Sequence, residues 1–146
     1  MTWLLSADMF EQLNAFGGIG GEFYLSTLLI VSFHFSLPAY WRWEVWRYPA
    51  TLGAAFTFWG SFRQWRGIQA GWEDIPWGSL WGGPEHGDMN TLYYDFGWSD
   101  TQIISTYNHL ASLCLLIILA LYLWRALWQH RRFLQNLWQQ LLARLA

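Results

Sequence analysis

The sequence predicts an all-helical integral membrane protein with about three transmembrane helices. Hydrophobic residues make up 54% of the 146 residues, and charged residues make up only 12%, about half the charged share of a soluble domain. The charges are also unevenly placed: no Arg or Lys lies between Arg66 and Arg125, where six carboxylates occur, and no Asp or Glu follows Asp100. Such asymmetry around apolar segments is typical of chains that lie on both sides of a bilayer. The length corresponds to a single domain, 1–146.

The aromatic content and the N-terminal residues agree with this class. The chain has 13 Trp and 7 Tyr, and both residue types concentrate at membrane–water interfaces. Residues 1–21 contain no Arg or Lys, and Asp8 and Glu11 interrupt their apolar start. We therefore expect a short interfacial segment and not a cleavable signal, ending in a flexible glycine-rich stretch at 17–21.

The first predicted span covers residues 23–41, which contain no charged residue. This length is about what a helix needs to cross the hydrocarbon core. The span opens after Glu22 and closes into a cluster of Trp, Tyr and Arg residues around Arg42 and Arg47, which is typical of a membrane interface.

The second predicted span covers residues 48–65, and its uncharged part is shorter. Gly53, Thr57 and Gly60 recur every three or four residues. Small residues at this spacing let two helices approach closely in lipid, so we expect this face to pack on another helix. The alternative is an interfacial or re-entrant helix, because Arg63 and Arg66 follow the apolar part.

Residues 67–101 are expected to form an external loop that is acidic, glycine-rich and Trp-rich. Its aromatic residues favour contact with the membrane surface or with a partner. Ser99 and Gln102 form a capping-box pattern, which predicts the start of a helix. The third predicted span, 102–124, is the most apolar.

The last segment, 126–146, is predicted to form a basic amphipathic helix. Leucines and aromatic residues recur at helical spacing, with Arg and Gln between them. Such a tail lies in the headgroup plane, docks on another helix, or continues the third span into the cytoplasm.

The arginines predict the orientation. Three spans with the N-terminus outside place six of them inside and two, Arg63 and Arg66, outside, whereas two spans with both termini inside divide the eight equally. The positive-inside tendency favours the three-span arrangement with the C-terminus in the cytoplasm. We expect a bacterial inner or intracytoplasmic membrane.

Two histidines lie within predicted spans and are candidate cofactor ligands. His34 and His109 would lie at depths of about 16 and 10 Å, close enough for one haem or chlorophyll-type tetrapyrrole to meet both. The favoured interpretation is structural, because Ser105, Asn108 and Ser112 share a stripe with His109 that is typical of a helix–helix seam.

The remaining charged and polar residues form no recognised catalytic or metal-binding motif. Glu85, His86 and Asp88 could contribute to a divalent metal site, but their spacing matches no known motif. No catalytic motif and no basic surface for nucleic acid occurs, so we expect a protein that is not an enzyme. Glu22 is expected outside the spans, so that no carboxylate lies at mid-membrane.

The sequence therefore favours a non-catalytic accessory subunit of a larger membrane complex, with lipids and other membrane subunits as partners. Its Trp-rich and small-residue surfaces exceed what so small a chain buries in itself. The alternative is a haem- or chlorophyll-holding subunit that uses His34, His109 or both. A small pore is less favoured, because the third span has no polar residue in its inner half after Ser112.

Overall fold

The computed structural model describes residues 7–35, 44–78 and 87–145, with side chains in 9–35, 45–78 and 87–131. Within these residues the protein is helical and contains no strand, so the predicted all-α class is confirmed. Three long helices account for most of the chain: α1 (Ala7–Ser32), α2 (Glu44–Gln69) and α4 (Asp100–Leu145).

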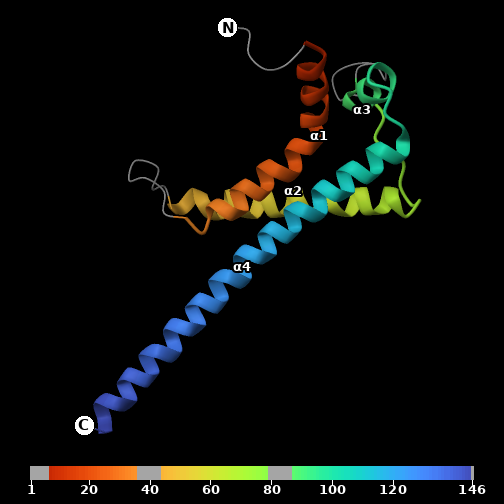
Figure 1. The fold of residues 1–146 in the computed structure, drawn as a ribbon. Helices are drawn as coiled ribbons and strands as arrows, with labels where there is room; N and C mark the ends of the chain where they lie inside the picture. Colours follow the sequence, from red (N-terminus) through yellow and green to blue (C-terminus); the bar gives the residue numbers. More distant parts are fainter. Residues whose placement is uncertain (1–6, 36–43, 79–86, 146) are drawn as a thin grey trace.

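The helices form a small bundle from which one of them projects. α1, α2 and the N-terminal half of α4 pack together, and α2 runs back in the opposite direction to its two neighbours (Figure 1). α4 is 46 residues long, about 69 Å at helical rise. Its C-terminal half extends beyond the other helices, so the predicted tail 126–146 continues α4 without a break as far as Leu145.

Two helices are long and apolar enough to cross a membrane, namely Met9–Ser32 in α1 and Asp100–Arg131 in α4. They correspond to the first and third predicted spans, with different limits. α2 does not meet the same criterion, so the structure supports two of the three predicted spans.

The first helix begins much earlier than predicted. α1 starts at Ala7, and the stretch 17–21 lies inside it, so the prediction of a flexible segment there is wrong. A Cβ atom at Gly18 would overlap the Asp88 carboxyl group, and one at Gly20 would lie 3.5 Å from Leu110 Cδ2. The missing side chains let neighbouring elements approach α1, which offsets the low helix propensity of glycine. Residues 36–41 of the predicted span lie outside the described residues.

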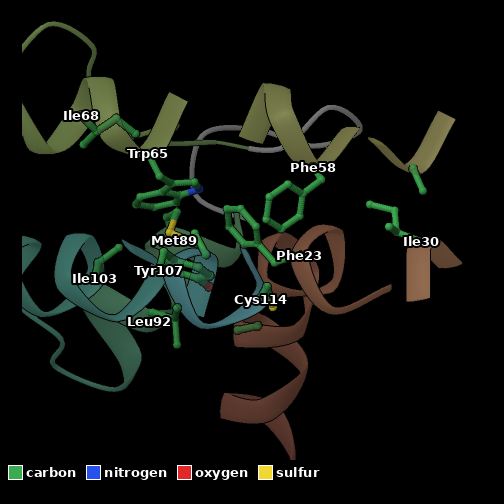
Figure 2. Close-up of a cluster of buried hydrophobic side chains, with 13 residues drawn as sticks. Phe23, Ile30, Phe58, Trp65, Ile68, Met89, Leu92, Ile103, Tyr107 and Cys114 are labelled. Atoms are coloured by element: carbon green, nitrogen blue, oxygen red, sulfur yellow. The ribbon is translucent and has the colours of Figure 1, made fainter. Parts of the chain in front are cut away.

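A single hydrophobic core joins the helices (Figure 2). Phe58 and Trp65 point from α2 towards Phe23 of α1 and Tyr107 of α4, respectively, with ring centroids 5.8 and 4.5 Å apart. The residues of α2 that are buried in this core recur at helical spacing and define its packed face: Ala54, Phe58, Ser61, Trp65 and Ile68.

The small-residue face of α2 is not the face that packs within the chain. Gly53, Thr57 and Gly60 are exposed, and a Cβ atom at either glycine would meet nothing within 4 Å. The aromatic residues of the packed face make ring contacts with α1 and α4 that the small residues could not make, which favours the observed orientation.

Part of the predicted loop 67–101 is helical and folds onto the bundle. The short helix α3 (Asp88–Asn90) leads directly into the π-helical segment η3 (Thr91–Asp95). Met89 and Leu92 are buried, and both elements contact α1. The predicted loop therefore contains a short helical segment, and the buried side chains of Met89 and Leu92 help to anchor it.

The start of α4 agrees with the capping box predicted from the sequence. The N–H of Ser99 donates to Gln102 Oε1 at 2.9 Å, and the N–H of Gln102 donates to Ser99 Oγ at 3.3 Å. This is the reciprocal pair of a capping box, as predicted.

Candidate functional site

The three long helices are joined by two groups of contacts at opposite ends of the bundle. The first group, which we call the tyrosine layer, consists of Phe16, Trp65, Tyr107 and Asn108. The fully buried Tyr107 ring stacks on Phe16 and on Trp65, at centroid distances of 5.3 and 4.5 Å. The Tyr107 hydroxyl donates to the Phe16 carbonyl oxygen at 3.2 Å, and Asn108 Nδ2 donates to the Trp65 carbonyl oxygen at 3.0 Å. α4 therefore holds both α1 and α2 at this level.

The second group, the arginine layer, consists of Arg47, Arg125 and the carbonyl groups of residues 32–35 at the end of α1. The Arg47 guanidinium, from α2, donates to three carbonyl oxygens at 3.2, 2.7 and 3.0 Å, those of Ser32, Phe33 and Phe35. Arg125, from α4, donates to the carbonyl oxygen of His34. The last carbonyl groups of a helix lack intrahelical donors and carry partial negative charge, so both guanidinium groups stabilise this end of α1.

The two layers are the same number of residues apart on each of the three chain segments. The intervals are 16–34 on α1 and its following turn, 47–65 on α2 and 107–125 on α4. Each interval is 18 residues, which is about 27 Å at helical rise on α2 and α4. On α1 the interval runs two residues past the end of the helix at Ser32, and the helix bends (Figure 1), so the distance is shorter there. The hydrocarbon core of a bilayer is about 30 Å thick. The spacing of the layers therefore matches the thickness of one bilayer.

The outer surface of the bundle is strongly apolar. Only 11% of the apolar window of α4 is buried, compared with 39% for that of α1. Trp46, Tyr48 and Trp124 lie next to the arginine layer in sequence, and each is more than half exposed. Exposed aromatic rings and arginines at one level are typical of a membrane interface.

The structure does not bring the two candidate cofactor ligands together. His34 lies two residues after the end of α1, and its ring contacts that of Tyr122 on α4 edge-on, with centroids 4.5 Å apart. His109 is exposed on α4 and lies 13 residues before Tyr122, about 20 Å along the helix. A cofactor bound by both imidazoles, as their predicted depths suggested, does not fit this arrangement. His34 Nε2 is buried without a hydrogen-bond partner among the described residues.

The polar stripe predicted on α4 divides between two roles. Asn108 and Ser112 face α2, where Arg66 donates to Ser112 Oγ at 3.0 Å and Ser112 Oγ donates to the Asn108 carbonyl oxygen at 2.7 Å. Ser105 instead donates to the Gln102 carbonyl oxygen at 3.1 Å, within its own helix.

The candidate metal ligands are not brought together within the described part of the chain. Glu85 and His86 lie outside the described residues. The carboxyl group of Asp88 lies against α1 at Gly18, where desolvation raises the pKa of Asp88 above its ordinary value. No group of three His, Cys, Asp or Glu residues that could hold a metal ion occurs among residues 7–35, 44–78 and 87–145.

Glu22 is the chemistry-bearing residue that the sequence interpretation misplaced. The first span was predicted to begin after it, but Glu22 lies near the centre of the apolar stretch Met9–Ser32. The buried Ser61 of α2 donates a hydrogen bond from Oγ to Glu22 Oε2, while the rest of Glu22 is exposed. The signal that could have found it is the helical spacing of apolar residues on both sides, from Ala15 to Ile30.

Comparison of the chain with protein-family models, with curated proteins and with solved structures gives no match. The geometry and chemistry of the chain itself therefore carry the functional inference.

Proposed function

We propose that the protein is a small non-catalytic subunit of a larger membrane complex, and that α1, α2 and α4 each cross the bilayer. The observation that carries the membrane part is the separation of the tyrosine and arginine layers by 18 residues along each of the three chain segments, which is about 27 Å on α2 and α4. α1 and α4 contain the two apolar stretches long enough to span. The uncharged residues 48–62 of α2 lie between the same two layers.

The contacts of α2 favour a crossing helix over an interfacial one. A helix in the interface plane has both ends at one depth. α2 instead contacts the end of α1 through Arg47 and the opposite end of the bundle through Trp65. The two ends of α2 are therefore held at different levels of the bundle, one at the arginine layer and one at the tyrosine layer.

The same contacts support the predicted orientation. Arg47 and Arg125 lie at one end of the bundle, and the later arginines of α4 extend beyond that end. Arg66 lies near the tyrosine layer at the other end, bonded to Ser112. The arginine-rich end faces the cytoplasm by the positive-inside tendency, with the N-terminus outside.

The subunit role is supported by surfaces that the chain leaves unpartnered. Gly53, Thr57 and Gly60 form an exposed small-residue face with open space beside both glycines. In lipid, such a face lets the backbone of a partner helix approach closely. The C-terminal half of α4 projects past the bundle and offers a second surface to a partner (Figure 1).

Purification of the tagged chain from its native membranes in mild detergent tests this proposal. We expect a defined complex with other membrane subunits. Gly53→Leu combined with Gly60→Leu should dissociate it without unfolding the chain, because a Cβ atom at either position would meet no atom of the described residues within 4 Å. Ala55→Leu, at an exposed position on another face of α2, is the matched control. A lone, monodisperse chain with no partner would contradict the proposal.

The second candidate function is a cofactor-holding subunit, and the observation that favours it is the buried, unpartnered Nε2 of His34. Neutral imidazole is a common axial ligand of haem iron. An absorption spectrum of the purified chain decides this: a Soret band that His34→Ala removes and His109→Ala keeps would support the candidate. The absence of any such band would remove it.

A further inference from the structure

We propose that the C-terminal half of α4, residues 126–145, is a docking surface for an acidic amphipathic helix of a partner protein on the cytoplasmic side. The proposal rests on the proposed function, in which α4 crosses the membrane with its C-terminus inside, and it names the chemistry of one partner. Three arrangements were predicted for this segment, and the helix that continues the third span is the one observed, because α4 is unbroken from Asp100 to Leu145.

Lipid does not cover this segment, because the segment projects away from the bilayer. Residues 101–146 contain no Gly or Pro, the usual causes of a kink, and Figure 1 shows α4 without a sharp bend. Leu145 lies 20 residues past Arg125 of the arginine layer, about 30 Å at helical rise. At a tilt of about 40°, the upper end of the range for membrane helices, α4 still ends about 23 Å beyond that layer. The polar region of one leaflet is only about 5–8 Å deep.

An apolar stripe runs along the projecting segment. At about 100° per residue, its members fall within a window of about 60° on one side of the helix. They are Leu127, Leu134, Trp138, Leu141 and Leu145. Leu127, the first of them, is 70% exposed. Apolar residues at this spacing on a helix that projects into water indicate a face that another protein covers.

The charges of the segment are all positive, and two of them border the stripe. Residues 126–146 contain three arginines and no Asp or Glu. Arg131, which is exposed, lies about 20° beyond one edge of the stripe, and Arg144 lies about 60° beyond the other edge. Positions that flank an apolar stripe are those whose charges select the partner of a helix.

Charge and apolar surface together select the occupant. A second copy of the chain would bring only positive charges to the borders of the stripe, which disfavours self-association. Nucleic acid carries the opposite charge, but its phosphate backbone offers no apolar surface to the leucines. A partner helix with Asp or Glu beside its own apolar residues covers the stripe and pairs with both arginines.

Zero-length crosslinking in inside-out vesicles from native membranes tests the proposal. The chain contains no Lys, so Arg144→Lys places a single side-chain amine beside the stripe. A water-soluble carbodiimide joins an amine to a carboxyl group as an amide, and the reagent takes up the water as a urea. We expect Arg144→Lys to be linked to an Asp or Glu of a protein that also co-purifies with the unmodified chain. Ala143→Lys, at the same level on the opposite face, is the matched control and should not be linked.

Substitutions in the stripe test whether the link depends on the apolar face. Leu134→Asp combined with Leu141→Asp should lower the yield of the linked product from Arg144→Lys about tenfold. Asn136→Asp combined with Gln140→Asp adds the same charge on the opposite face and should keep the product. Circular dichroism of both purified variants shows whether the helix persists.

Charge exchange tests the contact itself. Mass spectrometry of the linked peptides identifies the carboxylate of the partner, which we expect beside apolar residues at helical spacing. Arg131→Glu combined with Arg144→Glu should weaken the complex about tenfold, because like charges then meet at both borders. Replacement of the linked carboxylate by Arg in the partner should restore the complex.

Three results would overturn the proposal while a complex still purifies with the chain. They are the absence of a link from Arg144→Lys, an equal link from Ala143→Lys, and a link to lipid, to nucleic acid or to a second copy of the chain. Each of these results leaves the accessory role intact. Purification of the chain alone, with no partner, would contradict the proposed function and this inference together.

Discussion

Arg125 of α4 donates a hydrogen bond to the carbonyl oxygen of His34, 91 residues earlier in the sequence and two residues after the end of α1. Arg47 of α2 donates to the carbonyl groups on both sides of the same residue. The end of α1 is therefore fixed relative to both other long helices. Each arginine supplies positive charge where the helix presents its unpaired carbonyl groups.

Replacement of Arg125 should loosen the end of α1. Arg125→Gln removes the positive charge, and a favourable charge at a helix end contributes about 0.3–1 kcal/mol, so amide hydrogen exchange in residues 30–35 should rise about two- to fivefold. Arg125→Gln combined with Arg47→Gln should increase it further. Arg131→Gln, at an exposed position further along α4, is the control. Equal exchange in the double variant and the wild type would show that the arginine layer does not hold α1.

The tyrosine layer should depend more on the Tyr107 ring than on its hydroxyl. Tyr107→Phe loses one hydrogen bond to the Phe16 carbonyl oxygen, which costs about 0.6 kcal/mol between helices in a membrane. Tyr107→Ala also loses two ring stacks and leaves a cavity, at a cost of about 3–5 kcal/mol. Unfolding in detergent mixtures measures both values. Tyr94→Ala, at a residue 74% exposed, should be close to neutral. Similar losses for Tyr107→Phe and Tyr107→Ala would contradict this account.

Gly18 and Gly53 form a matched pair of helical glycines. A Cβ atom at Gly18 would overlap the Asp88 carboxyl group, whereas one at Gly53 would meet nothing within 4 Å. Gly18→Ala should displace α3 and raise hydrogen exchange in residues 87–95. Gly53→Ala should leave this segment unchanged, because only the helix propensity of α2 improves. Equal behaviour of the two variants would show that Gly18 does not provide room for α3.

The docking of α3 on α1 should weaken as pH rises. Desolvation raises the pKa of Asp88 above its ordinary value of 3.8, so the docked state binds more protons than the undocked one. The stability of docking is therefore fully present below pH 3.8 and decreases as pH rises through the raised pKa. Hydrogen exchange in residues 87–95, corrected for its intrinsic pH dependence, measures this. Asp88→Asn should remove the pH dependence of docking. A corrected exchange rate in the wild type that does not change with pH would contradict this prediction.

The sequence predicted those features that depend on neighbouring residues. The capping box at Ser99 and Gln102 needs only residues three positions apart, and it forms as expected. The long apolar run of α4 likewise identified a candidate span whose limits include the predicted 102–124. The continuation of the helix past Arg125 was one of the three alternatives predicted for residues 126–146.

Features that depend on contacts between distant elements could not be predicted in the same way. The first span was predicted to begin after Glu22, and the sequence contained no sign of its partner, because Ser61 lies 39 residues away on another helix. Gly18 was interpreted as part of a flexible stretch because the residue that lies against it, Asp88, is far away in the sequence. Met89 and Leu92 look like isolated apolar residues in a polar loop until α1 covers them.

Cysteine accessibility at three exposed positions tests the central claim, that α2 crosses the membrane together with α1 and α4. Val45→Cys, Asp74→Cys and Gln129→Cys are introduced singly into a Cys114→Ala background, since Cys114 is the one native cysteine and is buried. Intact cells are then treated with an impermeant maleimide. We predict that Asp74→Cys is labelled from outside, and that Val45→Cys and Gln129→Cys are labelled only after permeabilisation. Labelling of Val45→Cys and Asp74→Cys from the same side would contradict the account.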